Sequence, residues 1–474
     1  MSETKPTIWW VRRDLRVADN PALMAAIEAG GPVIPVFICD TLVEGFGAAP
    51  KWRLGLGVEA FARALEGMGS RLVLRSGEAL QVLRDLVAET GAGAVHWGRL
   101  YDPDAIARDT RVKAGLKDDG VEVMSHTGHV LFEPWTVQTK TGGFYRVYSP
   151  MWRAVKDRGV AAPLAAPGVV PAPEVWPGTE ALDDWALGTA MARGAQVCLP
   201  YQRVGEAAAQ ARMGWFVDEA IQTYKEARNY PARDATSGMS ENLTYGEISP
   251  RQCWCAGQRA LHEGAKGAET WLKELVWREF AYHLIYHTPH IASENWRREW
   301  DGFPWSEEGD TAEVLAWKQG QTGVPFVDAA MREMYVTGKM HNRARMIVGS
   351  YLTKHLMTHW RVGKAWFEDC LTDWDPASNA MGWQWVAGSG PDAAPYFRIF
   401  NPETQLDRFD PDHAYPARWI AEGREAPHRD AMAYFEAVPR SWELSQDDNY
   451  PAAPVVGLRE GRTRALTAYE ERKG

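Results

Sequence analysis

The sequence predicts a Rossmann-like α/β N-terminal domain with a doubly wound parallel sheet, followed by an all-helical C-terminal domain. Short apolar runs alternate with amphipathic stretches over the first third of the chain, which is typical of parallel strands joined by helices. A segment rich in Pro, Ala and Gly, Ala161–Gly178, indicates an extended connector. From about Tyr201 the patterning is helical. We divide the 474 residues into an α/β domain (1–132), an interdomain linker (133–205) and a helical domain (206–474).

The first domain is expected to contain five strands with helices between them. The apolar runs predict strands at Ile8–Val11, Val33–Cys39, Arg71–Arg75, Ala94–Trp97 and Val121–Met124. Amphipathic patterns predict helices near Pro21–Ala29, Lys51–Met68, Ala79–Thr90 and Pro103–Asp119. A capping side chain before Pro21 marks the first helix start. The turn after the first strand, Arg12–Arg16, lacks G-x-G-x-x-G, which argues against a conventional dinucleotide site there.

Composition narrows the class of protein. The N-terminus lacks the basic and apolar regions of a secretory signal, and no apolar run approaches the roughly 20 residues that span a bilayer. Five scattered cysteines fit free thiols in a reducing cytoplasm, so we expect a cytoplasmic protein without a metal site. We also expect the protein to be a monomer. A net charge of −10 argues against a generally basic nucleic-acid binder, but it allows a local basic groove. The 23 tryptophans exceed both Tyr and Phe, which suggests a use beyond core filling.

In the helical domain, the pattern Trp271–His287 places Glu274, Trp277 and Arg278 on one helical face. Such a face offers a hydrogen-bonding acid beside a stacking platform. On spacing alone, a solvated Glu–Arg pair next to a core tryptophan is the favoured interpretation. Further long helical patterns are expected at Phe326–Thr337 and Met346–Thr358.

The segment Lys339–Pro402 indicates a cofactor pocket, because polar and aromatic residues take the place of the usual core aliphatics. Asn342 and Met346 share a helical face, and Arg345 is offset so that it can pair with Asp373. Arg343 lies on another face, suited either to a phosphate at a pocket rim or to solvent. His355 and His359 are expected to be ordinary helix histidines.

Asp373–Asn379 is expected to be a loop, since Pro376 disfavours helix before it. Its two carboxylates are better suited to accept hydrogen bonds from a sugar hydroxyl or an arginine than to hold a metal, because no further hard ligands follow. The small residues of Gly382–Gly390 would let a flat ligand or a flipped base approach the backbone. The two indoles in that segment are also the side chains most easily oxidised by one electron.

These segments resemble the photolyase/cryptochrome flavoprotein family over nearly the whole chain, and most closely its bacterial cyclobutane pyrimidine dimer photolyases. The motifs that carry the resemblance are Trp10–Arg16, Tyr145–Pro150, Trp277–Phe280, Met340–Arg343, Gly382–Trp385 and Asp392–Pro402. The resemblance implies FAD bound in a U-shape within the helical domain. It implies further that the residues that hold the FAD phosphates and adjoining groups are Tyr224, Thr236, Ser237, Met239, Ser240 and Trp271. Those expected at the flavin and ribose are Arg278, Asn342, Asp373 and Asp375, with Arg345 paired to Asp373 and Asn379 facing flavin N5.

The resemblance also implies the reaction, which is light-driven repair of pyrimidine dimers in UV-damaged DNA. The lesion pocket of cyclobutane-dimer enzymes corresponds here to Glu274, Trp277, Asn342, Met346 and Trp385. Enzymes for the (6-4) photoproduct generally have a histidine at the position of Asn342. Contacts with the damaged strand are expected from Arg228, Arg343 and Arg398. The alternative function is a cryptochrome-type blue-light receptor without repair, and a third is an electron-transfer flavoprotein.

Two further sites follow from the resemblance. The photoreduction path corresponds to Trp383, Trp360 and Trp305. For the antenna chromophore we expect 5,10-methenyltetrahydrofolate, with 8-hydroxy-5-deazaflavin as second candidate, near Arg12, Cys39 and Asp104. Asp104 stands where folate-binding members often have an asparagine, so the usual folate pair is absent. Lys339 replaces a tryptophan that is common before Met-His-Asn-Arg.

Overall fold

The computed structural model describes residues 4–392 and 397–472. Near its N-terminus, five strands form one parallel sheet in the order β3-β2-β1-β4-β5, so the predicted doubly wound sheet is confirmed. The strands are β1 (Thr7–Val11), β2 (Val33–Cys39), β3 (Val73–Ser76), β4 (Ala94–Gly98) and β5 (Glu122–His126). β3 begins later than the apolar run suggests, because its ladder with β2 starts at the pair Val36 and Val73, while Leu72 is buried outside it.

Helices cover both faces of this sheet, since successive strand residues point to opposite sides. On one face, Trp9 packs with α1 (Pro21–Glu28) and α3 (Ala48–Glu66). On the other, Trp10 packs with α4 (Ala79–Thr90) and α5 (Pro103–Asp118). The short α2 (Thr41–Glu44) follows β2. Asn20 caps α1 as predicted, accepting a hydrogen bond from the backbone of Leu23.

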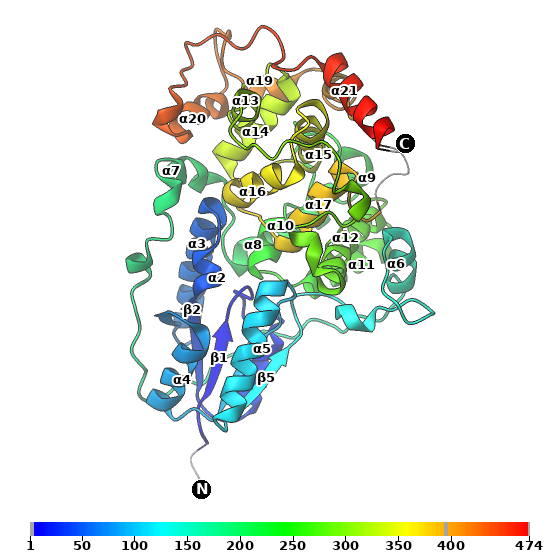
Figure 1. Ribbon diagram of the computed structural model, residues 1–474. Helices are drawn as coiled ribbons and strands as arrows, with labels where there is room; N and C mark the ends of the chain where they lie inside the picture. Colours follow the sequence, from blue (N-terminus) through cyan, green and yellow to red (C-terminus); the bar gives the residue numbers. More distant parts are fainter. Residues whose placement is uncertain (1–3, 393–396, 473–474) are drawn as a thin grey trace.

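The predicted connector, Ala161–Gly178, contains neither helix nor strand. It is nevertheless held in place, because the Val33 amide donates to the Pro171 carbonyl at 2.7 Å and Val170 is fully buried. Figure 1 shows the chain leaving the sheet past α6 (Tyr148–Val155) and climbing the side of the molecule to α7 (Gly194–Cys198). The predicted domain boundaries stay a prediction, with the last strand ending at His126 and helix α8 beginning at Glu206.

The C-terminal part is helical, as predicted, and lies above the carboxyl ends of the strands (Figure 1). Its helices are α8 (Glu206–Trp215), α9 (Tyr224–Ala227), α10 (Ser240–Tyr245), α11 (Pro250–His262), α12 (Ala268–His287), α13 (Ala312–Lys318), α14 (Pro325–Thr337), α15 (Asn342–Ser350), α16 (Trp360–Cys370), α17 (Pro376–Ala387), α18 (Pro402–Phe409), α19 (Ala414–Trp419), α20 (Arg429–Ala437) and α21 (Leu458–Glu471). None of the helices in the described residues has the length and apolarity needed to cross a membrane.

Two local predictions in this domain are wrong. Met346–Thr358 is not one helix: α15 ends at Ser350, a π-helical turn follows, and Met357 adopts a φ of 54° that breaks the helix. His359 consequently caps α16 instead of sharing a helical face with His355. Asp373–Asn379 is a loop only as far as Asp375, because Pro376 suits the first turn of α17.

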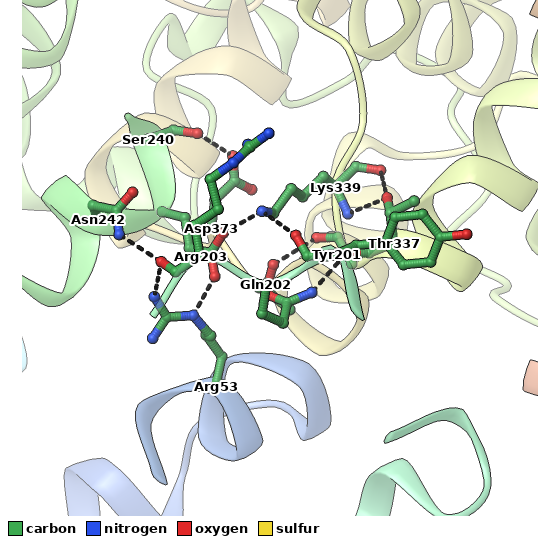
Figure 2. A network of polar contacts seen from close by, with 12 residues as sticks. Arg53, Tyr201, Gln202, Arg203, Ser240, Asn242, Thr337, Lys339 and Asp373 are labelled. Atoms are coloured by element: carbon green, nitrogen blue, oxygen red, sulfur yellow. Dashed lines mark hydrogen bonds and ion pairs between the residues drawn. The ribbon is translucent and has the colours of Figure 1, made fainter. Parts of the chain in front are cut away.

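A buried polar network joins the N-terminal domain to the helices above it. Arg53 of α3 is fully buried and pairs with Glu241 and Glu247. From the opposite side Lys339 pairs with Glu241 at 2.5 Å and donates to the Tyr201 carbonyl at 2.9 Å. Figure 2 shows Arg53 rising from α3 toward this cluster, with Lys339 beyond it. Lys339 therefore supplies the second cation for two buried carboxylates, which explains a lysine at this position.

Candidate active site

A cavity of about 230 Å³ opens in the helical domain between α9, α10, α12 and the start of α17. Most of its wall comes from residues that the sequence predicts to bind a cofactor or a lesion. These are Tyr224, Ser237, Met239, Ser240, Trp271, Glu274, Arg278, Arg345, Asp373 and Asp375. The remaining wall residues, which sequence reasoning missed, are Leu243, Thr244, Leu275 and Ser378. Leu243 and Thr244 lie one helical turn after Ser240, so helical spacing alone would have found them.

One side of the cavity is a hydrogen-bonded triad from three separate segments. The Ser240 hydroxyl donates to Asp373 at 2.7 Å. Arg345 of α15 donates from Nη2 to both oxygens of Asp373, at 2.9 and 2.7 Å. The expected Arg345–Asp373 pair is thus present, and it ties α10, α15 and the loop before α17 together.

Asp375 forms a second polar point on the wall. It caps α17 by accepting a hydrogen bond from the Ser378 amide at 2.8 Å, and the Tyr282 hydroxyl donates to its other oxygen. Burial raises the pKa of Asp375, but Arg13, Arg278 and the Tyr282 hydrogen bond together lower that pKa below its ordinary value. Asp375 therefore carries a negative charge into the cavity at neutral pH.

Glu274 and Arg278 share a face of α12, as predicted, but they do not form the solvated pair that spacing favoured. Glu274 pairs with Arg228 at the C-terminal end of α9. Arg278 donates to the His129 carbonyl at 2.9 Å. Each charge finds a partner on another element, so the helix presents both side chains to the cavity.

Three expected cofactor residues are outside the cavity wall. The Thr236 carbonyl accepts a hydrogen bond from Arg212 at 2.7 Å. Asn342 is exposed at the first position of α15. Asn379 donates from its amide to the Lys364 carbonyl at 3.1 Å. Their expected roles stay predictions.

Three residues expected at the lesion, Trp277, Met346 and Trp385, are not among those that line the cavity. Trp277 stacks on Tyr148, with ring centroids 3.7 Å apart and planes 6° from parallel. Met346 and Trp385 are both half-buried. Trp277 is thus a rigidly held indole, whose stacking on Tyr148 fixes its plane.

Four arginines gather near the α9 end of the cavity. Burial lowers the pKa of Arg343, and Arg228, Arg408 and Arg398 lower it further because their charges are close by. Arg343 also donates to Asn229, and its guanidinium lies 4.3 Å from the centroid of the Phe409 ring. The sequence predicts three of these residues. Arg408 was missed, although it lies in α18, shortly after the Asp392–Pro402 motif.

The three tryptophans expected to conduct electrons are all buried, and the structure brings them near one another. Trp383 of α17 packs directly on Gly363, one turn after Trp360 in α16. The His359 ring lies 5.3 Å from Trp360 and 5.3 Å from Trp305, measured between ring centroids. An aromatic series thus runs from α17 through α16 to the segment before α13.

Two glycines after Trp385 shape the end of α17. Gly388 has a φ of 93° and ends α17. A Cβ on Gly390 would lie 2.7 Å from the Gln384 carbonyl carbon. Gly388 and Gly390 therefore close the end of α17, and the approach of a ligand to the backbone of Gly382–Gly390 stays a prediction.

Comparison with known proteins identifies the family. A model described as DNA photolyase matches residues 7–170, and one described as the FAD binding domain of DNA photolyase matches residues 271–471. The chain belongs to the DNA photolyase family. A deoxyribodipyrimidine photo-lyase of Agrobacterium fabrum is 44% identical, with 98% of both chains covered. A crystal structure of a bacterial class III photolyase from Agrobacterium tumefaciens superposes with a TM-score of 0.91 at 44% identity, covering 100% of this chain and 98% of that one. Cryptochrome-2 of Arabidopsis thaliana is 31% identical over 90% of this chain and 72% of its own length.

The cavity suits the FAD that members of this family bind. The Ser237 hydroxyl and the guanidinium of Arg278 offer donors to phosphate, while Asp373 and Asp375 offer acceptors to sugar hydroxyls. Met239, Leu243 and Leu275 add apolar surface for a flat ring. The donors and acceptors that line the cavity therefore fit the diphosphate and the sugar hydroxyls of FAD.

The candidate antenna residues occupy separate positions in the N-terminal domain of this family member. Arg12 is buried at the end of β1, where it pairs with Asp109 at 2.7 Å. Cys39 is buried at the end of β2, and burial raises the pKa of its thiol to about 11. Asp104 is exposed in the first turn of α5. An antenna site at these residues stays a prediction.

Proposed function

We propose that this protein is a light-driven enzyme that repairs cyclobutane pyrimidine dimers in UV-damaged DNA with FAD in the described cavity. One observation carries the proposal above the others. Glu274 lines the cavity with the cofactor-binding residues and at the same time pairs with Arg228 of the arginine cluster. The Glu274 carboxylate thus lies where the cofactor cavity meets the arginine cluster.

Within the cavity, Ser237 and Ser240 would hold the phosphates of FAD. Asp373 and Asp375 would contact its hydroxyl-bearing portion and its ring. Tyr224, Thr236, Met239, Trp271 and Arg278 would complete this wall, with Asn342 and Asn379 reaching the flavin. When bound and reduced, FAD would supply light-driven one-electron chemistry to the dimer. The protein supplies position, polarity and shelter from water.

The lesion has to leave the duplex to reach the cavity. Damage weakens stacking and pairing, so extrusion costs less at a dimer than at intact bases. Trp277 and Trp385 would form flat walls for the extruded dimer, with Met346 beside them. Glu274 would bind the pyrimidine edge, where a preorganised group stabilises the charge that develops.

Two further sets of residues would serve DNA binding and electron transfer. The phosphates of the damaged strand would be contacted by Arg228, Arg343 and Arg398. Electrons would reach the flavin through Trp383, Trp360 and Trp305.

The finer assignments belong to the same proposal. The name of the relative from Agrobacterium fabrum, deoxyribodipyrimidine photo-lyase, supports dimer repair over a purely signalling role. For the antenna we propose 5,10-methenyltetrahydrofolate, or else 8-hydroxy-5-deazaflavin, near Arg12, Cys39 and Asp104. The free cysteines fit a reducing cytoplasm, where we propose that the protein works as a monomer.

The test is repair of a defined lesion. Purified protein with reduced FAD is illuminated with an oligonucleotide that contains one thymine dimer, and the recovery of intact thymines is followed. We expect recovery that depends on light. A normal flavin spectrum without any recovery would contradict repair and favour a receptor.

A further inference from the structure

The turn after β1, Arg12–Arg16, contacts the helical domain at the place where sheets of this kind usually bind a ligand. Ligands in open α/β sheets bind at the carboxyl ends of the strands. Here the Leu15 amide donates to the Tyr245 carbonyl at 3.1 Å, and Arg16 donates to the Gly246 carbonyl at 2.9 Å. A Cβ on Gly246 would lie 2.6 Å from the Asp14 Cα, so the two backbones are in close contact. The end of α10 thus occupies this position.

Arg13 extends from this turn to the wall of the cavity. It is buried, with 7% of its surface exposed, and it donates from Nε to the Thr244 carbonyl at 2.7 Å. Its Nη2 lies 3.3 Å from Oδ2 of Asp375, which is 6% exposed. Both partners line the cavity, so the N-terminal domain reaches the cofactor site through one side chain.

The other contacts of Asp375 leave its charge to be balanced mainly by Arg13. The Ser378 amide and the Tyr282 hydroxyl donate hydrogen bonds but carry no charge. Arg278 is the second nearby cation, and its guanidinium is engaged by the carbonyl and ring of His129 and lies near Glu279. Among the described residues, Arg13 is the cation that the structure pairs directly with Asp375.

The ionisation of Asp375 agrees with this geometry. Burial opposes its charge, and Arg13 is the largest of the influences that lower its pKa. A fixed negative charge beside a flavin opposes the uptake of electrons, because charges interact strongly where water is excluded. A guanidinium in contact with that carboxylate offsets its negative charge, so the flavin takes up electrons more readily.

We propose that Arg13, in the N-terminal domain, is a positioning residue that holds and neutralises Asp375 and thereby raises the reduction potential of the flavin in the helical domain. This inference rests on the proposed function, since it takes the cavity to be the FAD site. It gives the Arg12–Arg16 turn a role in tuning the cofactor, in addition to joining the domains.

The test measures the midpoint potential of bound FAD by spectroelectrochemistry in the full-length holoprotein. Arg13→Met should make the potential more negative, so that the ratio of reduced to oxidised flavin at a fixed electrode potential falls by about tenfold. Arg13→Lys, which keeps the charge, should restore most of the shift. Arg16→Met removes a guanidinium of the same turn that bonds across the interface without touching the cavity wall, and it should leave the potential unchanged.

A double-mutant cycle separates positioning from a distant charge effect. In an Asp375→Asn background, Arg13→Met should shift the potential far less than in the wild type, because the carboxylate through which it acts is gone. An equal shift in both backgrounds, or no shift in Arg13→Met, would overturn the inference. If Arg13→Met does not fold, Arg13→Gln keeps a donor for Thr244 and is measured instead.

Failure of this inference is distinguishable from failure of the proposed function. Wild-type protein that binds FAD and repairs dimers, with a potential insensitive to Arg13, would overturn the inference alone. Wild-type protein that binds no FAD would overturn the proposed function, and the inference with it.

Discussion

Glu274 joins two parts of the site at a single side chain. Its carboxylate lines the cavity and pairs with Arg228, while a third of the side chain remains exposed. When a lesion binds, the same carboxylate is expected to leave Arg228 and bind the pyrimidine edge. Arg228 is then free for a phosphate. One ion pair thus holds both groups ready in the absence of DNA.

Glu274→Gln should therefore lower the repair yield far more than the affinity for damaged DNA. The amide keeps the size of the side chain but loses the charge that a hydrogen bond to the reacting pyrimidine uses, so we expect about a tenfold loss of repair per absorbed photon. Affinity should change little, since Arg228 is released rather than lost. Repair yield is measured by recovered thymines and affinity by fluorescence anisotropy, and equal losses in both would contradict the role of Glu274 in the electron step.

Arg343 belongs to the arginine cluster and should act on DNA through phosphate. Arg343→Gln should weaken binding to damaged and undamaged duplexes alike, and it should reduce the slope of log K against log salt by about 1. Binding isotherms between low and moderate salt provide the measurement. Arg63→Gln changes an exposed arginine of α3 in the N-terminal domain and serves as control, with an unchanged slope expected.

Single residues were predictable from the sequence to different degrees. The Arg345–Asp373 pair was expected because a positive and a negative charge stood in two segments of one presumed pocket, and the structure contains it. The contact of Arg13 with Asp375 was not expected. It joins positions 362 residues apart, and nothing in either segment indicates the other as its partner.

Helical elements show the same contrast. Spacing of three and four residues correctly placed Glu274 and Arg278 on one face of α12. It failed beyond Ser350, because a break at Met357 depends on a left-handed backbone that no periodicity reveals. It also missed Pro376 as the beginning of α17. A proline stops the helix before it but is well suited to the first turn of the next one.

The packing of α17 on α16 gives a prediction at this scale. A Cβ on Gly363 would lie within 2.6 Å of three carbons of the Trp383 ring. Gly363→Ala should cost about 1–3 kcal/mol of unfolding free energy through overpacking, and it should slow photoreduction of the flavin by displacing Trp383 from Trp360. Denaturant titration and flash absorption measure the two effects.

Gly214→Ala is the matched control for that change. A Cβ at Gly214, in α8, would meet no atom within 4 Å. This substitution should leave photoreduction unaltered and raise the unfolding free energy by about 0.5–1 kcal/mol, as alanine does in a helix. Normal photoreduction in Gly363→Ala would argue that Trp383 and Trp360 are not neighbours in the electron path.

At the scale of the whole molecule, the sheet and its covering helices were predictable because each strand and helix is defined by local periodicity. The way the two halves join was not, since buried charges such as Arg53 and Glu241 look like surface residues in a sequence. The structure places them in one network with Lys339. Lys339, which we expected to replace a tryptophan of the family, is thus part of the domain interface.

Lys339→Met should lower the unfolding free energy by about 2 kcal/mol, because Glu241 and Glu247 would then share Arg53 alone. Adding Glu241→Gln should recover part of that loss by removing the unbalanced charge. Lys156→Met, at an exposed lysine, should change stability by no more than about 0.5 kcal/mol. Thermal or denaturant unfolding of the full chain measures all three. An unchanged unfolding free energy in Lys339→Met would contradict the proposed balance of charges.

The central claim is that the cavity binds FAD and that the arginine cluster beside it binds DNA, so that a lesion reaches the flavin. The most direct measurement counts dimers repaired after a single flash in an oligonucleotide bound to the full-length protein, with FAD either reduced or oxidised. We predict repair after the flash when FAD is reduced, and no repair when it is oxidised or kept in the dark. Repair in the dark, or none after the flash with reduced FAD and bound DNA, would contradict the account.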